Sequence, residues 1–204
     1  MKKGQVTEGV IERVDFPNKG IFTAEDGSRV VVKNTIPGQK VSVRILKARK
    51  GNCEGNLLEI LEPSPMEREE PGCVHAGICG GCIYQTLSYE DQLRLKTDQV
   101  KRLLEGVILP ENGAYEFTGS EMSPCRTGYR NKMEFSFGDE YKDGPLALGM
   151  HRRGSFYDIV NVPDCRLVEP DFGTVLSVTL SYFKERGVSY YHKMRHTGYL
   201  RHLL

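Results

Sequence analysis

The stretch Val41-Ser42-Val43-Arg44-Ile45-Leu46 alternates apolar and polar side chains, which is the pattern of a β-strand with one buried face. Four further segments of strand character accompany it, at residues 6–14, 21–23, 29–33 and 57–61. Five short strands predict a small closed or nearly closed β-barrel over residues 1–62. An oligonucleotide-binding (OB-like) barrel and an SH3-like barrel without a nucleic-acid role fit this pattern equally well.

The rest of the chain mixes helices with strands. Residues 63–71 are rich in proline and charge and predict a linker. Ser88-Tyr89-Glu90-Asp91 is typical of a helix start, with Gly106 as its end, and a second amphipathic helix is expected from Pro170 to Gly187. Between them, residues 132–162 show the alternation of a three-stranded antiparallel meander. We therefore predict an α+β, mostly β fold, with a central α+β domain over residues 72–187.

Composition places the chain among soluble globular proteins. Hydrophobic residues make up 39% and charged residues 27% of its 204 residues, and the net charge is +1. The N-terminus lacks the apolar core of a signal peptide, and no apolar run approaches the roughly 18 residues of a membrane span. We expect a cytoplasmic monomer without a membrane partner. Thiols stay reduced in that compartment, so clustered cysteines there more often bind metal than form disulfides.

The segment Cys73-Val-His-Ala-Gly-Ile-Cys79-Gly-Gly-Cys82 places three thiols within ten residues. The spacing of Cys79 and Cys82 is used in both zinc and iron–sulfur sites. Cys165, which follows a predicted strand, is the best candidate for a fourth ligand. Structural zinc sites usually supply two close pairs, and the second pair is absent, so the spacing favours a 4Fe–4S cluster, with zinc as the alternative. His75 is expected to be a neighbour of this site rather than a ligand.

The two remaining cysteines are single. Cys53 lies in a Gly-Asn-Cys-Glu-Gly segment that predicts a turn, and Cys125 lies in Ser-Pro-Cys-Arg-Thr. Neither has a nearby histidine or carboxylate base in the sequence, so we expect no catalytic role for either thiol.

A basic segment precedes the predicted meander. Arg126-Thr127-Gly128-Tyr129-Arg130-Asn131-Lys132 combines three cations with an aromatic ring and an amide. This mixture suits phosphate contacts and base stacking, although a solvated turn explains it equally well. His151-Arg152-Arg153, on a turn of the meander, adds cations to the same candidate face. The candidate RNA-binding residues are Arg126, Tyr129, Arg130, Asn131, Lys132, His151 and Arg152.

The order of these motifs resembles that of the TRAM-domain, iron–sulfur-containing 23S rRNA (uracil-5-)-methyltransferases. The resemblance covers essentially the whole chain, and the Cys-x5-Cys-Gly-Gly-Cys spacing with a distant cysteine is its most specific part. It rests on the following segments: Ile36-Pro37-Gly38-Gln39-Lys40-Val41, the three clustered cysteines, Gln85, Tyr89, Gln92, Lys96, Tyr129-Arg130-Asn131-Lys132, Leu148-Gly149-Met150-His151 and Val162-Pro163-Asp164-Cys165.

The resemblance implies a TRAM barrel that grips RNA over residues 1–62. It also implies a structural 4Fe–4S cluster, held by Cys73, Cys79, Cys82 and Cys165 in a small central domain. Members of that family continue into a Rossmann-like domain that binds S-adenosylmethionine and carries a cysteine nucleophile and a glutamate base. Those motifs are not in this sequence, and residues 188–204 resemble only the beginning of that domain.

The expected function is therefore that of the RNA-binding and iron–sulfur portion of an S-adenosylmethionine-dependent rRNA uracil-5-methyltransferase. We expect 23S rRNA as its partner and no catalytic residue within the chain, so it is not expected to methylate RNA alone. The alternative is a stand-alone RNA-binding adaptor with a structural metal site.

Overall fold

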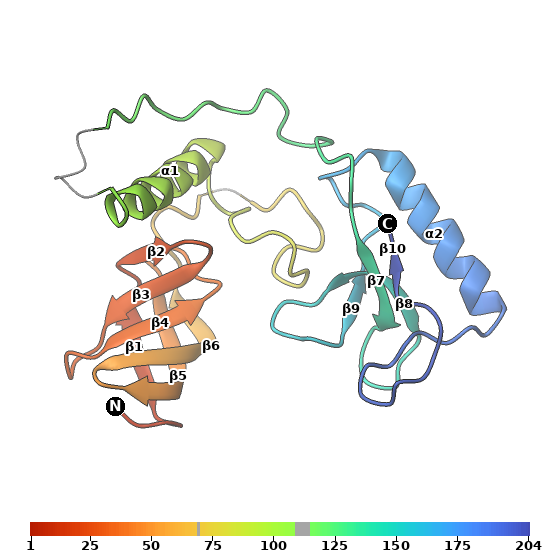
Figure 1. Ribbon diagram of the computed structural model, residues 1–204, viewed down its shortest axis with the longest axis horizontal. Coiled ribbons are helices and arrows are strands. Elements are labelled where there is room, and N and C mark those ends of the chain that lie inside the picture. Colours follow the sequence, from red (N-terminus) through yellow and green to blue (C-terminus); the bar gives the residue numbers. More distant parts are fainter. Residues whose placement is uncertain (69, 109–114) are drawn as a thin grey trace. The chain divides into compact units, whose positions relative to one another are not determined.

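The computed structural model describes residues 1–68, 70–108 and 115–204 (Figure 1). The chain divides into two compact units. The first unit comprises Met1–Glu70 and Thr86–Met122, and the second comprises Pro71–Gln85 and Ser123–Leu204. Among the described residues, no helix is both long enough and apolar enough to cross a membrane.

A six-stranded sheet forms the body of the first unit. Its strands are β1 (Val6–Val10), β2 (Arg13–Asp15), β3 (Lys19–Thr23), β4 (Arg29–Lys33), β5 (Lys40–Arg49) and β6 (Asn52–Glu62). Their order in the sheet is β1-β5-β6-β4-β3-β2, with β4 and β6 parallel and the other neighbours antiparallel. Because β1 and β2 are consecutive in the chain but end opposite sides of this order, the sheet must curl upon itself. The sheet thus has six strands where the sequence indicated five.

One apolar core fills the curled sheet. Val41, Val43 and Ile45 are buried on alternate positions of β5, as their pattern predicts. Cys53 also belongs to this core, so its predicted placement in a turn was wrong. The actual turn between β5 and β6 is Lys50-Gly51, both with positive φ. The glycine that suggested a turn, Gly55, lies within β6, where a Cβ atom would come 2.1 Å from Val43.

Helix α1 (Tyr89–Glu105) begins and ends where the sequence predicts. The hydroxyl of Ser88 accepts a hydrogen bond from the Asp91 N–H, and Gly106 ends the helix. Gln99 and Arg102 both donate to the carbonyl oxygen of Val14 in β2, at 3.2 and 3.0 Å. By these contacts α1 belongs to the first unit (Figure 1), whereas the sequence had grouped it with the central domain.

A four-stranded antiparallel sheet forms the second unit. Strands β7 (Phe135–Asp139), β8 (Leu146–His151) and β9 (Ile159–Asn161) make the predicted meander, and β10 (His202–Leu203) pairs with β7 at the edge. Residues 190–203 therefore return to the same sheet. The sequence of residues 188–204 resembled the beginning of another domain, but within the described chain these residues belong to the second unit.

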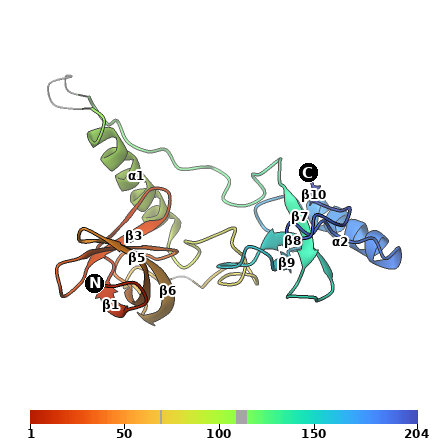
Figure 2. The same cartoon turned by 60° about the horizontal axis from the view of Figure 1, so that its bottom comes forward.

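Helix α2 (Pro170–Glu185) lies along this second sheet (Figures 1 and 2). Pro170 occupies its first turn, where a missing N–H costs nothing. Leu176 reaches the core that contains Phe135 and Leu148, and Cys79 and Cys165 pack against the same core. The core of the second unit therefore positions two of the four cysteines singled out by their spacing.

Candidate metal centre and nucleic-acid interface

The cysteine loop, residues 73–82, is fastened to the turn that follows β8. The Gly80 N–H donates to the His151 carbonyl at 2.9 Å, and the Arg153 N–H donates to the Ile78 carbonyl at 2.7 Å. The guanidinium of Arg153 also donates to the carbonyl of Cys82. The backbone around two thiol-bearing positions is thus held by the meander.

Cys165 is connected to the other end of the same loop. It lies in a turn in which its N–H donates to the Val162 carbonyl, just after β9. The next residue, Arg166, donates from its guanidinium to the Gly72 carbonyl at 2.7 Å, immediately before Cys73. The chain segments that carry all four candidate ligands therefore meet within the second unit.

The electrostatics of Cys79 indicate how close the thiols lie. Burial raises the pKa of the Cys79 thiol, and the Gly81 N–H, 3.4 Å from its sulfur, acts in the opposite direction. Three neighbouring thiols raise that pKa further, those of Cys82, Cys165 and Cys73. Yet no group of three or more His, Cys, Asp or Glu in the described part of the chain already stands as a metal site. The four thiols nevertheless share one neighbourhood in the second unit.

Two buried nitrogens of this region have no hydrogen-bond partner among the residues that the structure describes. They are Nε2 of His75, inside the cysteine loop, and Nε of Arg153, whose guanidinium contacts Cys82. An unsatisfied buried polar group costs about 1–3 kcal/mol. Thiolate or sulfide sulfur would supply acceptors, and four thiols are the soft ligands that iron–sulfur and zinc sites use. The chemistry of the residues present therefore fits a sulfur-ligated metal centre.

The basic segment, residues 126–132, runs beside the Cys165 turn. The Gly128 N–H donates to the Arg166 carbonyl and the Arg130 N–H to the Leu167 carbonyl, both at 2.9 Å. Gly128 has a positive φ of 63°, which a glycine adopts without strain. Tyr129 is 52% exposed, and the guanidinium of Arg130 lies 6.0 Å from the centre of its ring. This backbone attachment presents the side chains of the segment to solvent.

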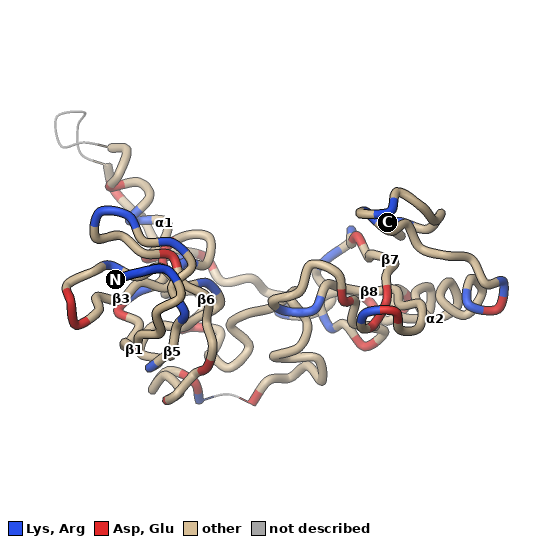
Figure 3. Tube along the Cα trace, turned by 90° about the horizontal axis from the view of Figure 1, so that it is seen from below, with Lys and Arg blue, Asp and Glu red and all other residues tan. Residues whose placement is uncertain are grey.

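All seven candidate RNA-binding residues lie in the second unit and on its surface. Five belong to the basic segment: Arg126, Tyr129, Arg130, Asn131 and Lys132. His151 and Arg152 end β8 and meet the cysteine loop, where Arg152 pairs with Cys79 in an isolated β-bridge. In Figure 3 cationic and acidic positions are interspersed over each unit, which agrees with the net charge of +1. The basic segment thus lies next to the Cys165 turn, and His151 and Arg152 lie next to the cysteine loop.

The structure adds a pocket that the sequence interpretation missed. It has a volume of about 330 Å³ and is lined from β7, the end of β8 and residues 190–202. His151 is its only lining residue that the sequence had singled out for RNA binding. The lining residues between 190 and 202 were missed because this tail had been assigned to another domain. The signal was present, since aromatic, histidine and cationic residues are concentrated between Tyr190 and His202.

Comparison with curated proteins gives matches along the whole chain. All 204 residues align with a protein named uncharacterized RNA methyltransferase from Caldanaerobacter subterraneus subsp. tengcongensis, at 46% identity. Proteins of the same description from Clostridium tetani and Clostridium acetobutylicum are 41% and 39% identical. The chain spans 44% of the length of each of these relatives. No protein-family model matches the sequence.

A solved structure shares the fold. It is the crystal structure of Pyrococcus abyssi tRNA (uracil-54, C5)-methyltransferase in complex with S-adenosyl-L-homocysteine, with a TM-score of 0.64 and 22% identity. The match covers 96% of this chain and 41% of that chain. At this identity the likeness concerns the fold alone. The chain is therefore homologous to part of proteins named RNA methyltransferases and has the fold of part of a solved one.

Proposed function

We propose that this chain is the RNA-binding and iron–sulfur part of an S-adenosylmethionine-dependent RNA uracil-5-methyltransferase, with 23S rRNA as its substrate. One observation carries the proposal most directly. An exposed segment with three cations and an aromatic ring is hydrogen-bonded to the turn that bears Cys165. The names of the curated relatives support an RNA substrate, and the chain spans less than half of their length.

The basic segment supplies the two interactions that single-stranded RNA requires. Arg130 and Lys132 are exposed and offer charged donors to phosphate oxygens. Tyr129, with half of its surface exposed, offers a face on which an unstacked base can lie. Arg152, at the other side of the cysteine loop, adds a further exposed cation.

In this account the first unit is the TRAM-like, OB-like barrel of the resemblance. Its curled sheet leaves Arg44, Arg49 and Lys50 exposed. Barrels of this general kind bind oligonucleotides on an outer face and through connecting loops. We assign to the first unit a second binding surface for the RNA backbone, weaker than that of the second unit.

Cys73, Cys79, Cys82 and Cys165 are the residues that would hold the 4Fe–4S cluster. The bound cluster would cross-link the chain segments that carry these four cysteines, and it would take no part in methyl transfer. The chain itself already joins the cysteine loop to the meander and the Cys165 turn to the basic segment. Ligation of all four thiols would lock these two connections together and fix the RNA-binding side chains in place.

RNA binding by the anaerobically purified chain tests the proposal. A fluorescent 23S rRNA stem–loop and a tRNA are titrated, and binding is followed by anisotropy. We expect the stem–loop to bind and the double variant Arg130→Gln/Lys132→Gln to bind about tenfold or more weakly, because two phosphate contacts are lost. The matched control, Lys184→Gln/Arg186→Gln at the end of α2, removes two cations from the same unit and should leave binding unchanged.

Two results would contradict the proposal. One is the absence of binding to either RNA, and the other is an equal loss of affinity in the two double variants. Tighter binding of the tRNA would instead replace 23S rRNA as the substrate. Addition of S-adenosylmethionine should produce no 5-methyluridine, and turnover by this chain alone would refute the claim that it is only part of the enzyme.

A further inference from the structure

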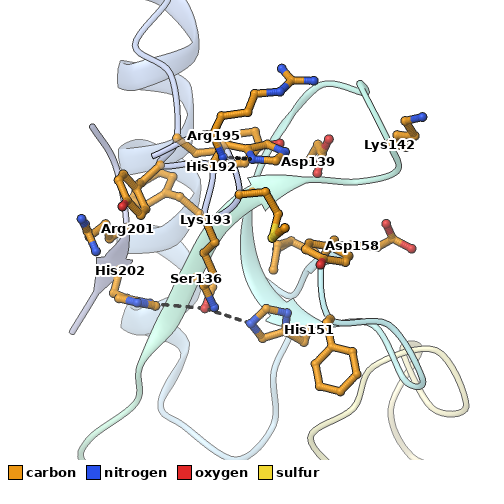
Figure 4. A pocket seen from close by; sticks show the side chains of 18 of the residues that line it. Ser136, Asp139, Lys142, His151, Asp158, His192, Lys193, Arg195, Arg201 and His202 are labelled. Atoms are coloured by element: carbon orange, nitrogen blue, oxygen red, sulfur yellow. Dashed lines mark hydrogen bonds between the residues drawn. The ribbon is translucent and has the colours of Figure 1, made fainter. Parts of the chain in front are cut away.

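The pocket of the second unit has two chemically different ends. It lies between β7, the end of β8, residues 156–158 and the tail segment 190–202 (Figure 4). Its volume of about 330 Å³ is at the lower end of the range for small-molecule sites, which suits one nucleotide better than a larger ligand.

Hydrogen-bond donors converge at one end. The hydroxyl of Ser136 lies 3.5 Å from Nε2 of His151 and 3.3 Å from Nδ1 of His202, and Figure 4 shows it between the two rings. Lys193 points toward this group in Figure 4, and its charge is among those that lower the pKa of His151, after burial itself. A hydroxyl, two imidazoles and an ammonium around one point form a site for an anion such as phosphate.

Ser136, His202 and Glu134 are not arranged as a catalytic triad. The carboxylate of Glu134 lies 3.4 Å from Nδ1 of His202, the same nitrogen that Ser136 contacts. A catalytic triad needs the nucleophile and the carboxylate on opposite nitrogens of the histidine ring. His202 therefore does not connect Glu134 to Ser136 as a triad histidine would.

Aromatic side chains line other parts of the cavity, together with the carboxylates of Asp139, Asp143 and Asp158. Tyr157 is 59% exposed at the rim, and Tyr190 is more deeply placed. Burial raises the pKa of Tyr190, as does its hydrogen bond to the carboxylate of Asp139, which favours the neutral phenol. Such rings provide flat apolar faces for a nucleobase next to the anion site.

We propose that this pocket takes one nucleotide of a single-stranded RNA, with a phosphate at Ser136, His151, His202 and Lys193 and the base against Tyr157 and Tyr190. The inference rests on the proposed function, because RNA is the partner, and it adds a nucleotide site separate from the basic segment. His151 connects the pocket to the cysteine loop, since it lines the pocket and its carbonyl accepts the Gly80 N–H. When an RNA strand binds at the end of β8, one of its nucleotides therefore lies next to the opening of the pocket.

Photo-crosslinking and affinity measurements test this inference in the full chain. A single-stranded oligoribonucleotide carrying 4-thiouridine is bound, irradiated and mapped by mass spectrometry, and we expect cross-links in residues 156–158 and 190–195. Tyr157→Ala should weaken binding about tenfold, because it removes the ring on which a base would stack. Tyr199→Ala is the matched control, because Tyr199 is 80% exposed on the same tail segment and does not line the pocket.

The charged end has its own pair of variants. Lys193→Ala should weaken binding of the same oligoribonucleotide. Lys184→Ala, which replaces an exposed lysine of α2, should leave this binding unchanged. Free uridine 5′-monophosphate is titrated in parallel while the imidazole resonances of His151 and His202 are followed by NMR. We expect both resonances to shift at millimolar concentrations, because one nucleotide lacks the contacts of its neighbours in a strand.

The outcomes separate this inference from the proposed function. RNA binding with cross-links only outside the pocket and unchanged affinity of Tyr157→Ala and Lys193→Ala would overturn the inference and leave the proposed function standing. Shifts with the mononucleotide but no binding of RNA would overturn the RNA assignment of the pocket together with the proposed function. A chain that binds neither ligand would refute both.

Discussion

At the scale of single residues, Gly173 shows how closely α2 approaches the segment that bears Cys165. A Cβ atom at this position would lie 2.0 Å from the carbonyl oxygen of Pro163. We predict that Gly173→Ala lowers the free energy of unfolding by about 1–3 kcal/mol, as overpacking does, although alanine favours helices by about 1 kcal/mol over glycine. Thr174→Ala, exposed on the same helix, is the control. Urea unfolding followed by circular dichroism measures both, and a Gly173→Ala chain as stable as the unmodified protein would contradict the packing.

His151 provides a prediction about pH. Burial lowers the pKa of His151, and the nearby charges of Lys193 and His202 lower it further. A histidine whose pKa is depressed by folding binds protons more readily in the unfolded chain. Its contribution to stability is therefore lost as the pH falls below about 6.5 toward the lower pKa of the folded state. NMR titration should give a midpoint for His151 below 6.5, and a bound phosphate should raise it; a midpoint above 6.5 in the free chain would be inconsistent with this environment.

At the scale of elements, α1 is attached to the curled sheet by polar contacts. Gln99 is buried at 4% exposure and shares the Val14 carbonyl with Arg102, whose Nε also lies 3.4 Å from the carboxylate of Asp15. We predict that Gln99→Ala lowers the free energy of unfolding by about 1 kcal/mol, the usual net value of one hydrogen bond. Lys96→Ala, on the exposed side of the helix, should change it little. Equal stabilities of the two variants in thermal unfolding would show that the Gln99 contact contributes nothing.

The helices were predictable because their signals are local. Ser88 and Gly106 bound α1, and Pro170 stands in the first turn of α2, so a few neighbouring residues decide each end. The parallel pairing of β4 with β6 was not predictable, since it joins segments more than twenty residues apart. Within β6, the glycine at position 55 imitated a turn signal, although its actual role is to let Val43 pack closely.

The candidate site was predictable to a similar extent. The cysteines and the basic segment stand out because unusual residues are adjacent in the sequence. The hydrogen bonds that join the Cys165 turn to Gly72 and to Gly128 arise only when the chain folds. The pocket is the extreme case, since Ser136 and His202 are 66 residues apart and meet only because β10 pairs with β7.

At the scale of the whole molecule, binding of RNA should depend on local cations, because the net charge is only +1. The logarithm of the affinity for a single-stranded RNA should fall linearly with the logarithm of the salt concentration. Each phosphate contact contributes a slope of about −0.7. We predict that Lys132→Gln makes the slope less negative by about this amount, whereas Lys184→Gln leaves it unchanged. A slope near zero in the unmodified chain would contradict an electrostatic grip on the backbone.

The central claim is that four cysteines of an RNA-binding chain hold an iron–sulfur cluster. Iron and sulfide analysis of the anaerobically purified chain, together with its absorption spectrum, tests this claim most directly. The account predicts about four irons and four sulfides per chain and a broad band near 400 nm. Cys165→Ala should lose most of this iron, whereas Cys125→Ala, at an exposed thiol remote from the loop in sequence, should keep it. One zinc per chain without colour, or full iron content in Cys165→Ala, would contradict the account.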